Sequence, residues 1–143
     1  MSNDNEIDAI RQKKMEEMLN KNIVNFPENI VNIESVDHFN NVVNDYKDSL
    51  IIVDMWAPWC RPCLAFAPAF EALQKEYLKA GKSVIFSKLN VDEHGSIAQQ
   101  FQVTGIPTTL FINNKKLVHR QVGMVPKAQF AQVIEAVLKK ISE

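Results

Sequence analysis

The stretch VDMWAPWCRPC, residues 53–63, contains the only two cysteines of the 143-residue chain. Cys60 and Cys63 are separated by an arginine and a proline, and Trp59 comes directly before them. If Cys60 lies at the N-terminus of a helix, Cys63 lies one turn further on, so both sulfurs reach the same side. Two intervening residues also close a very small ring when the pair is oxidised. The spacing therefore favours a reactive pair of sulfurs.

A helix N-terminus would favour the negatively charged form of the first sulfur. Unpaired backbone N–H groups and the helix dipole stabilise a thiolate there, and the thiolate is the nucleophile. Arg61 adds a positive charge beside Cys60, and Pro62 suits the first turn because that turn needs no N–H from it. We expect Trp59 to lie flat beside the pair, where it limits water and offers an apolar surface to an incoming protein.

Two other interpretations of the cysteines are open at this point. A CxxC pair can be half of a zinc site, but such sites usually have a second CxxC or paired histidines. The only histidines, His38, His94 and His119, are scattered along the chain, so no metal site is expected. The pair could also be incidental buried cysteines, although a tryptophan before it and a proline within it favour a redox motif.

Length and composition are those of one globular domain with a sizeable core, with 46% apolar and 23% charged residues. Sixteen basic and 17 acidic side chains give 16 − 17 = −1, which gives no reason to expect nucleic acid or a membrane surface as a partner. No apolar run approaches the ~20 residues that span a bilayer. The acidic start, MSNDNEIDAI, lacks the pattern of a secretory signal. We therefore expect the cytosol, where thiols are kept reduced.

The hydrophobic pattern predicts five helices and five strands. Helices are expected over 6–20, after a cap at Ser35, over 60–78 with a kink at Pro68, over 96–101, and from Pro126 onward. Strands are expected over 29–33, 50–55, 83–89, 108–112 and 117–122. Alternating strands and helices predict parallel strands, and the last two strands predict an antiparallel hairpin. Its turn, Asn113-Asn114-Lys115, has no glycine, so Lys115 is expected to need a positive φ.

Five blocks, in order along the chain, resemble the thioredoxin family. They are VDMWAPWCRPC (53–63), APAF (67–70), SKLNVDE (87–93), TGIPTTLF (104–111) and QVGMV (121–125). The resemblance runs from about Asn29 to the C-terminus. It implies a thioredoxin-like α/β three-layer sandwich over residues 29–143, in which helices flank a central mixed sheet. Residues 1–28 are then an N-terminal helical extension.

The resemblance implies that Asp54 helps to deprotonate Cys63, directly or through a water, with Lys88 as its charge partner. A physical reason supports this, because an unpaired carboxylate in the apolar run 50–55 would be costly and its pKa should rise. A carboxyl that exchanges a proton near neutral pH suits acid–base work. The alternatives are a strand-end Asp54 that faces solvent and an ordinary surface lysine at position 88.

The resemblance also implies a target-binding surface around a cis Ile106-Pro107 bond, although sequence statistics alone favour trans. The Ile106 backbone would pair with an extended target segment, and Gly123 would leave room for it unless it is a simple turn glycine. Val122 and Met124 would complete an apolar rim or belong to the core. Trp59, Arg61 and Pro62 would complete the target-binding set.

The implied activity is thiol–disulfide exchange, in which Cys60 attacks a disulfide of a target protein and Cys63 resolves the mixed disulfide. No cofactor is needed beyond the Cys60–Cys63 disulfide, and a thioredoxin reductase-type protein would recharge it. The alternatives are a thiol oxidase or isomerase and a non-catalytic binding module of the same fold.

Arg61 departs from the glycine usual in the family, and Leu64 replaces a residue that is often basic. Because a stabilised thiolate favours the dithiol form, we expect a somewhat less reducing protein.

The N-terminal extension lies outside the resemblance. Its apolar residues occur at roughly helical spacing, at Ile7, Ile10, Met15, Met18 and Leu19. A solvated helical tail is one interpretation. The other is a helix that packs on the domain or on a second copy, because an exposed apolar stripe is a liability. We expect a monomer, with a dimer through this helix as the alternative.

Overall fold

The computed structural model describes residues 7–13 and 26–143. Residues 7–13 are helical, and the later elements follow the predicted order. They are β1 (Val31–Asn32), α2 (Val36–Asp45), β2 (Leu50–Trp56), α3 (Arg61–Lys79), β3 (Val84–Asn90), α4 (Gly95–Gln100), β4 (Thr108–Asn113), β5 (Lys116–Val122) and α5 (Lys127–Ile141). Most boundaries agree with the predicted ones to within one or two residues. The largest relative difference is at β1, which is two residues long and not five, because it pairs with β3 at Val31 and Asn32 alone.

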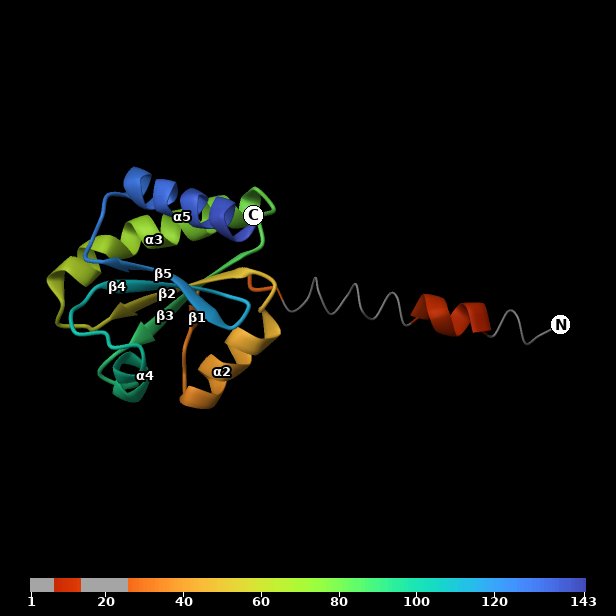
Figure 1. Ribbon diagram of the computed structural model, residues 1–143, viewed down its shortest axis with the longest axis horizontal. Coiled ribbons are helices and arrows are strands. Elements are labelled where there is room, and N and C mark those ends of the chain that lie inside the picture. The colour runs from red at the N-terminus through yellow and green to blue at the C-terminus, as the bar shows by residue number, and fades with distance from the viewer. Residues whose placement is uncertain (1–6, 14–25) are drawn as a thin grey trace.

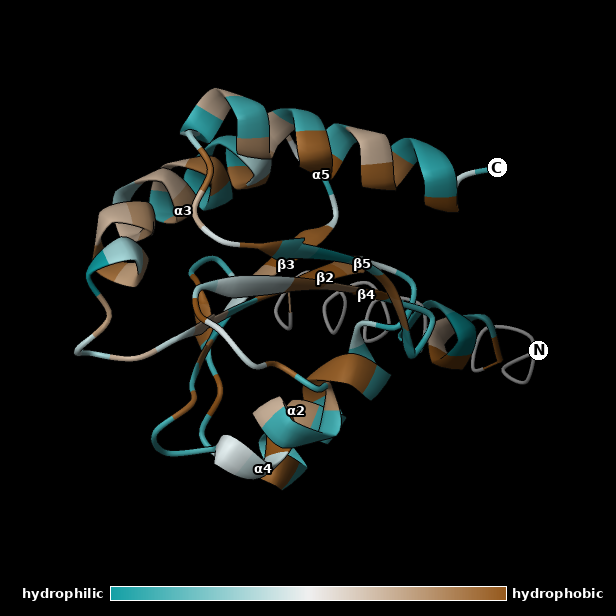
Figure 2. Ribbon diagram, turned by 60° about the vertical axis from the view of Figure 1, so that its left-hand side comes forward, coloured by the Kyte–Doolittle hydropathy of each residue, from teal (hydrophilic) through white to brown (hydrophobic). Residues whose placement is uncertain are grey.

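The five strands form one mixed sheet in the order β1-β3-β2-β4-β5, with β2 at its centre (Figure 1). The pairs β1–β3 and β2–β3 are parallel, whereas β2–β4 and β4–β5 are antiparallel. Helices α3 and α5 cover one face and α2 and α4 the other (Figure 2). The predicted three-layer sandwich with a mixed sheet is therefore confirmed.

The alternation of side chains along β2 divides the core into two layers. Leu50 and Ile52 face α3 and α5, whereas Ile51, Val53 and Met55 face α2 and α4. The layer beneath α3 and α5 is built around five buried phenylalanines, Phe66, Phe70, Phe86, Phe111 and Phe130. Their ring centroids lie 5.0–6.2 Å apart, within the range of favourable aromatic contacts. By the same alternation, residue 54 faces this layer.

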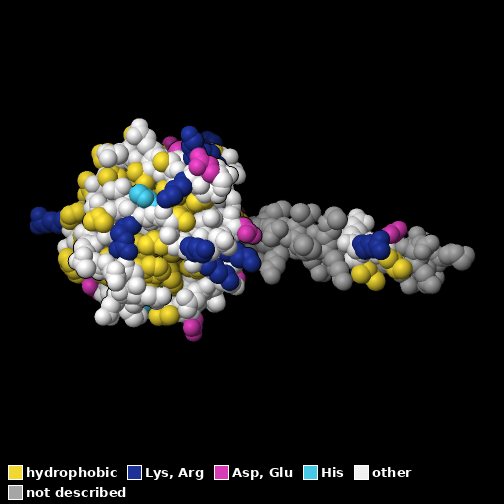
Figure 3. Space-filling view, viewed as in Figure 1, with side chains coloured by type: hydrophobic (Ala, Val, Ile, Leu, Met, Phe, Trp, Pro, Cys, Tyr) yellow, Lys and Arg dark blue, Asp and Glu magenta, His cyan; other side chains and the backbone are white. Residues whose placement is uncertain are grey.

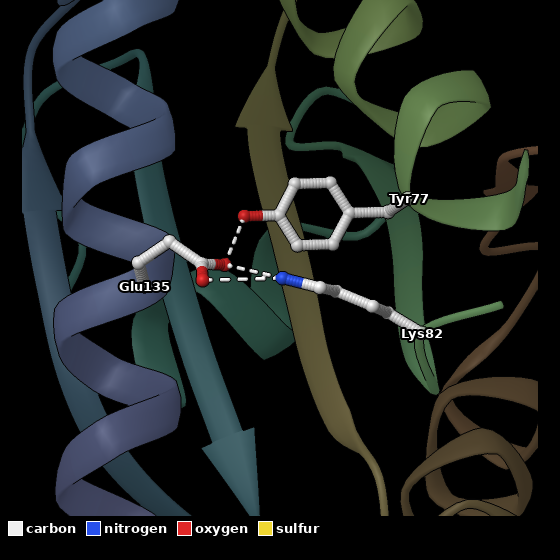
Figure 4. A network of polar contacts seen from close by, with 3 residues as sticks. All are labelled: Tyr77, Lys82 and Glu135. Atoms are coloured by element: carbon white, nitrogen blue, oxygen red, sulfur yellow. Dashed lines mark hydrogen bonds and ion pairs between the residues drawn. The ribbon is translucent and has the colours of Figure 1, made fainter. Parts of the chain in front are cut away.

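A polar network joins the end of α3 to α5 (Figure 4). The Tyr77 hydroxyl donates to Glu135 Oε2 at 2.5 Å, and Lys82 Nζ lies 3.1 and 3.3 Å from the two oxygens of the same carboxylate. The hydrogen bond from Tyr77 lowers the pKa of Glu135, while burial and this contact raise the pKa of Tyr77. Lys82 also lies 5.2 Å from the centroid of the Tyr77 ring. The network holds α5 against the end of α3 that is far from the cysteines.

The N-terminal part of the described chain is exposed over residues 7–13 and packs on the domain from residue 26. Ile7 and Ile10 are 47% and 55% exposed, and Met15, Met18 and Leu19 lie outside the described residues. By contrast, Phe26 packs against the α2 layer of the core, and Gln74 Nε2 donates to the Glu28 carbonyl at 3.0 Å. No helix in residues 7–13 or 26–143 is long and apolar enough to cross a membrane.

Strand β5 forms one edge of the sheet, because it pairs only with β4 among the strands described. Its basic side chains are Lys116, His119 and Arg120. The Arg120 guanidinium donates to the carbonyls of Phe101 and Gln102, which ties the edge to the end of α4. On the face shown in Figure 3, Lys and Arg side chains are spread among apolar ones.

The turn between β4 and β5 has the backbone that its sequence predicts. Asn114 has φ 52° and Lys115 has φ 63°, and both values lie in the left-handed region that side chains with a Cβ disfavour. The Asn114 N–H donates to the Lys47 carbonyl at 2.9 Å, so the turn is also held from outside the hairpin. The positive φ expected at Lys115 is confirmed.

Replacement of Lys115 by glycine should stabilise the fold. Glycine adopts positive φ without the Cβ penalty, so we expect Lys115→Gly to raise the free energy of unfolding by about 1 kcal/mol. Urea denaturation would measure this. Lys116→Gly is the matched control, since it removes the same charge from a residue in the strand and should cost about 0.5–1 kcal/mol. Equal effects of the two changes would contradict the interpretation.

Candidate active site

The two cysteines are joined by a disulfide at the start of α3. Cys60 is the N-cap residue, and its sulfur accepts a hydrogen bond from the Cys63 N–H at 3.2 Å. Their Cα atoms lie 5.2 Å apart. The chain reaches this cap by a tight loop after β2, in which the Cys60 N–H donates to the Ala57 carbonyl at 3.1 Å. The predicted position of both sulfurs on one side of a helix N-terminus is thus confirmed.

The sulfurs are close to the surface but largely covered. Cys60 is 4% exposed and Cys63 is 2% exposed, and Ala57, Trp56 and Ile106 pack around them. The residues between the cysteines, Arg61 and Pro62, are exposed, and Pro62 lies in the first turn of α3 as expected. Arg61 therefore places a positive charge next to the residue whose sulfur accepts the Cys63 N–H from the first turn of α3.

Trp59 is 68% exposed and is held by a residue to which the sequence analysis gave no role. Its indole N–H donates to both oxygens of Asp92, at 3.1 and 3.2 Å. Asp92 lies just after β3 and within the block SKLNVDE, but only the folded chain brings it beside residue 59. The Asp92 N–H donates to Asn90 Oδ1 at 2.9 Å. This hydrogen bond holds the backbone of the turn that carries the Asp92 carboxylate.

The Ile106-Pro107 bond is cis, in agreement with the resemblance and against the statistics for such bonds. The Ile106 carbonyl oxygen lies 3.7 Å from Cys60 Sγ, so this loop lies against the disulfide. Next to it, the Gly123 N–H donates to the Pro107 carbonyl at 2.8 Å, and Gly123 has φ 86°. Glycine is the residue that adopts this backbone without strain. The positive φ therefore agrees both with a simple turn glycine and with a glycine that leaves room for a target.

An apolar surface surrounds the disulfide. Val122 is 65% exposed and Met124 is 47% exposed, so both belong to the rim and neither belongs to the core. On the side of α4, a groove of about 360 Å³ opens beside the disulfide. The groove is lined by Trp59, Val91, Ala98, Val103, Thr104, Gly105 and Ile106. The surface therefore offers apolar contacts on both sides of the Ile106 backbone.

Asp54 is fully buried, which excludes the interpretation that it faces solvent. Neither of its carboxylate oxygens has a hydrogen-bond partner among the described residues. Burial raises the pKa of Asp54 from 3.8 to about 7, and the nearby charge of Lys88 opposes this rise. The carboxyl therefore exchanges its proton near neutral pH, as the sequence predicts for a lone acid in an apolar strand.

Lys88 is the register partner of Asp54 on β3 and is half-buried. Its ammonium lies 4.5 Å from the centroid of the Trp56 ring, and it forms neither an ion pair nor a hydrogen bond with the Asp54 carboxylate. The cation–π contact thus holds Lys88 close enough for its charge to act on Asp54 without direct contact. The alternative of an ordinary surface lysine does not fit this position.

The histidines do not join the cysteines. His38 Nδ1 accepts the Glu34 N–H at 3.0 Å, His94 lies beside Glu93, and His119 contacts the Phe111 ring. Within residues 7–13 and 26–143, no group of three or more His, Cys, Asp or Glu side chains could hold a metal ion. The described site is therefore a pair of sulfurs with one buried acid.

Comparisons with known proteins agree with this geometry. Residues 30–136 match the family model described as Thioredoxin. A thioredoxin of Haemophilus influenzae is 43% identical over 105 residues, which are 73% of this chain and 94% of that protein. A chloroplastic M-type thioredoxin of Spinacia oleracea is 43% identical over 88 residues, 62% of this chain and 47% of that protein.

Solved structures give the same result at the level of the fold. The crystal structure of a Fasciola hepatica thioredoxin aligns with a TM-score of 0.68 at 33% identity, over 75% of this chain and 98% of that one. A thioredoxin of Nicotiana alata aligns with a TM-score of 0.69 at 32% identity, over 77% of this chain and 93% of that one.

The raised pKa of Asp54 predicts how stability depends on pH. The folded chain holds this proton up to about pH 7, whereas the unfolded chain releases it near 3.8. The stability that the folded chain gains by holding the Asp54 proton is therefore fully present below about pH 4 and is lost as pH rises to about 7. At ~1.4 kcal/mol per pKa unit, the loss is about 4 kcal/mol. Asp54→Asn, which remains neutral, should be more stable than the unsubstituted chain at pH 9 and lack this loss.

Urea denaturation of the oxidised chain at pH 4, 7 and 9 measures the effect. Asp48→Asn removes an exposed carboxylate and serves as the matched control, whose pH dependence should follow that of the unsubstituted chain. Parallel pH profiles for Asp54→Asn and Asp48→Asn would show that burial does not hold the Asp54 proton.

Proposed function

This chain belongs to the thioredoxin family and is a thiol–disulfide oxidoreductase, and we propose that Cys60 is its attacking sulfur and Cys63 its resolving sulfur. The observation that carries this assignment is the N-cap position of Cys60. The hydrogen bond from the Cys63 N–H and the positive end of α3 stabilise negative charge on that sulfur. Cys63 lies one turn deeper and is the less exposed of the two, which suits a sulfur that attacks only its neighbour.

The reaction transfers two electrons in two exchanges. The Cys60 thiolate attacks one sulfur of the target disulfide, which forms a mixed disulfide and releases the first target thiolate. Cys63, once deprotonated, attacks Cys60 Sγ, which forms the Cys60–Cys63 disulfide and releases the second target thiolate. The protons of the two cysteines end on the target thiols. Because the two sulfurs carry both electrons, the exchange needs no cofactor.

Asp54 is proposed to take the proton of Cys63. It faces the layer beneath α3, whose first turn contains Cys63, and its carboxyl exchanges a proton near pH 7. A base whose pKa lies near the working pH transfers protons most effectively. Lys88 is proposed to tune this carboxyl from β3 through its charge, since it makes no direct contact with it.

Target proteins are proposed to bind across the cis-proline loop. An extended segment would add its backbone to that of Ile106, as in strand addition, and place its disulfide beside Cys60 Sγ. The open space and positive φ at Gly123 support a close approach of the target backbone. Trp59, Val122 and Met124 supply exposed apolar contacts, and Arg61 and Pro62 border the same surface.

The remaining assignments follow from the family and the sequence. We propose residues 29–143 as the redox domain, with residues 1–28 as an N-terminal helical extension that stays solvated, since Ile7 and Ile10 are exposed. Packing of this extension on the domain or on a second copy is the alternative. We propose a monomer in the cytosol that a thioredoxin reductase-type protein recharges. A thiol oxidase or isomerase is the second candidate, and the observation that favours it is the exposed positive charge of Arg61 beside Cys60. A binding module without catalysis would not require a buried acid behind the sulfurs.

Serine variants of the two cysteines should behave differently when they are tested for disulfide reduction and for trapping of the target. With insulin as the disulfide target and dithiothreitol as the electron source, Cys60→Ser should give only the background rate of precipitation. Cys63→Ser makes the same chemical change at the resolving position. Once it has been reduced, freed of dithiothreitol and then mixed with insulin, it should accumulate mixed disulfides that gel electrophoresis without reductant detects. Full activity of Cys60→Ser, or equal trapping by both variants, would contradict the assignment.

Arg61 should make the protein less reducing. Its charge favours the Cys60 thiolate and therefore the dithiol form, so Arg61→Gly should have a more negative reduction potential, by about 10–30 mV. Equilibration with a glutathione buffer measures the potential. Arg61→Lys keeps the charge and should remain close to the unsubstituted protein. Equal potentials for Arg61→Gly and the unsubstituted protein would refute this role and remove the observation that favours an oxidase.

A further inference from the structure

A row of polar side chains crosses the face of the sheet that α3 and α5 cover. Lys88, Asp54, Thr109 and Gln121 are successive register partners on β3, β2, β4 and β5. Partners in register direct their side chains to the same face, with Cβ atoms about 4.5–5.5 Å apart in an antiparallel pair. Asp54 is 0% exposed and Thr109 is 1% exposed, so the two central members of the row are sealed from solvent.

Neither central member has a hydrogen-bond partner in the part of the chain that the structure describes. The two oxygens of Asp54 and Oγ1 of Thr109 make no hydrogen bond to any described residue. An unsatisfied buried polar group costs about 1–3 kcal/mol, and valine would fill the space of Thr109 without that cost. Other buried hydroxyls of the sheet are satisfied by backbone carbonyls. Ser87 donates to Ile52 at 2.9 Å and Thr108 donates to Gly105 at 2.5 Å.

We propose that Thr109 is a positioning residue for the proton of Asp54, and that its hydroxyl and the Asp54 carboxyl share one buried water molecule. The two groups are cross-strand neighbours without a direct hydrogen bond. Buried waters bind where polar groups would otherwise be unsatisfied. A hydroxyl donates to a carboxylate and accepts from a carboxylic acid. The hydrogen bond to the ionised carboxylate is the stronger of the two, so the bridge favours the charged form of Asp54. The inference rests on the proposed function, in which Asp54 accepts the Cys63 proton.

The groups around Asp54 allow the effect of the Thr109 hydroxyl on its carboxyl to be tested separately from the effect of nearby charges. Lys88 is the charged side chain that acts on this carboxyl, and its ammonium is held on the Trp56 ring. On β5, His119 shares the face one row further along, and α3 contributes the cysteine pair. The side chains that α5 buries in this layer are apolar, Phe130, Ile134 and Val137. Loss of the Thr109 hydroxyl therefore leaves every charge around Asp54 unchanged.

The test is the titration of the Asp54 carboxyl carbon by NMR in the oxidised full-length chain. Thr109→Val keeps the shape and removes the hydroxyl that stabilises the carboxylate, so its titration midpoint should rise by about one pH unit. Thr109→Ser keeps a hydroxyl and should stay near the unsubstituted midpoint. Thr109→Ala lacks the hydroxyl with less bulk and should shift the midpoint in the same direction as Thr109→Val.

An unchanged midpoint in Thr109→Val, or an equal rise in Thr109→Ser, would overturn the inference, because a merely structural threonine moves the melting temperature and not the titration. The pH profile of mixed-disulfide resolution separates this result from the proposed function. It should shift with the Asp54 midpoint in Thr109→Val and be insensitive to residue 109 in an Asp54→Asn background. A shifted titration with an unshifted profile would support the positioning role and refute the catalytic role of Asp54.

Discussion

Burial of β2 on both faces is the constraint on which the fold and the site depend. Residues 50–55 are at most 1% exposed, so each side chain must fit one of two apolar layers, and the strand has neighbours on both sides. This fixes the direction in which the chain leaves the sheet after Trp56. The loop that follows carries Cys60 to the start of α3, and the same strand places Asp54 beneath that helix. One buried element therefore positions both the sulfurs and the acid behind them.

The site combines two opposite ways of treating charge. At the helix N-terminus, backbone N–H groups stabilise a negative sulfur near the surface, where a partner can reach it. Beneath the helix, burial disfavours the charged form of Asp54, which raises its pKa. The first arrangement favours attack and the second retains a proton until it is needed.

Much of this arrangement could be predicted from sequence. Hydrophobic periodicity identified the elements, and a lone aspartate in an apolar strand indicated its own burial. Resemblance supplied the cis bond, against the general preference for trans. Asp92 beside Trp59, Lys88 over Trp56 and the unsatisfied hydroxyl of Thr109 could not be predicted in this way, because each depends on the relative position of segments far apart in the chain. Local patterns specify which face a residue occupies, but not what another strand or loop places opposite it.

The open side of β5 has a consequence for behaviour at high concentration. Among the strands described, β5 pairs only with β4, and a seven-residue edge strand can pair with the same strand of another molecule and extend the sheet. Lys116 and Arg120 lie on this strand, and two antiparallel copies would bring like charges together. Repulsion between these charges opposes growth of the sheet through this edge, which is a common way in which proteins protect an edge strand.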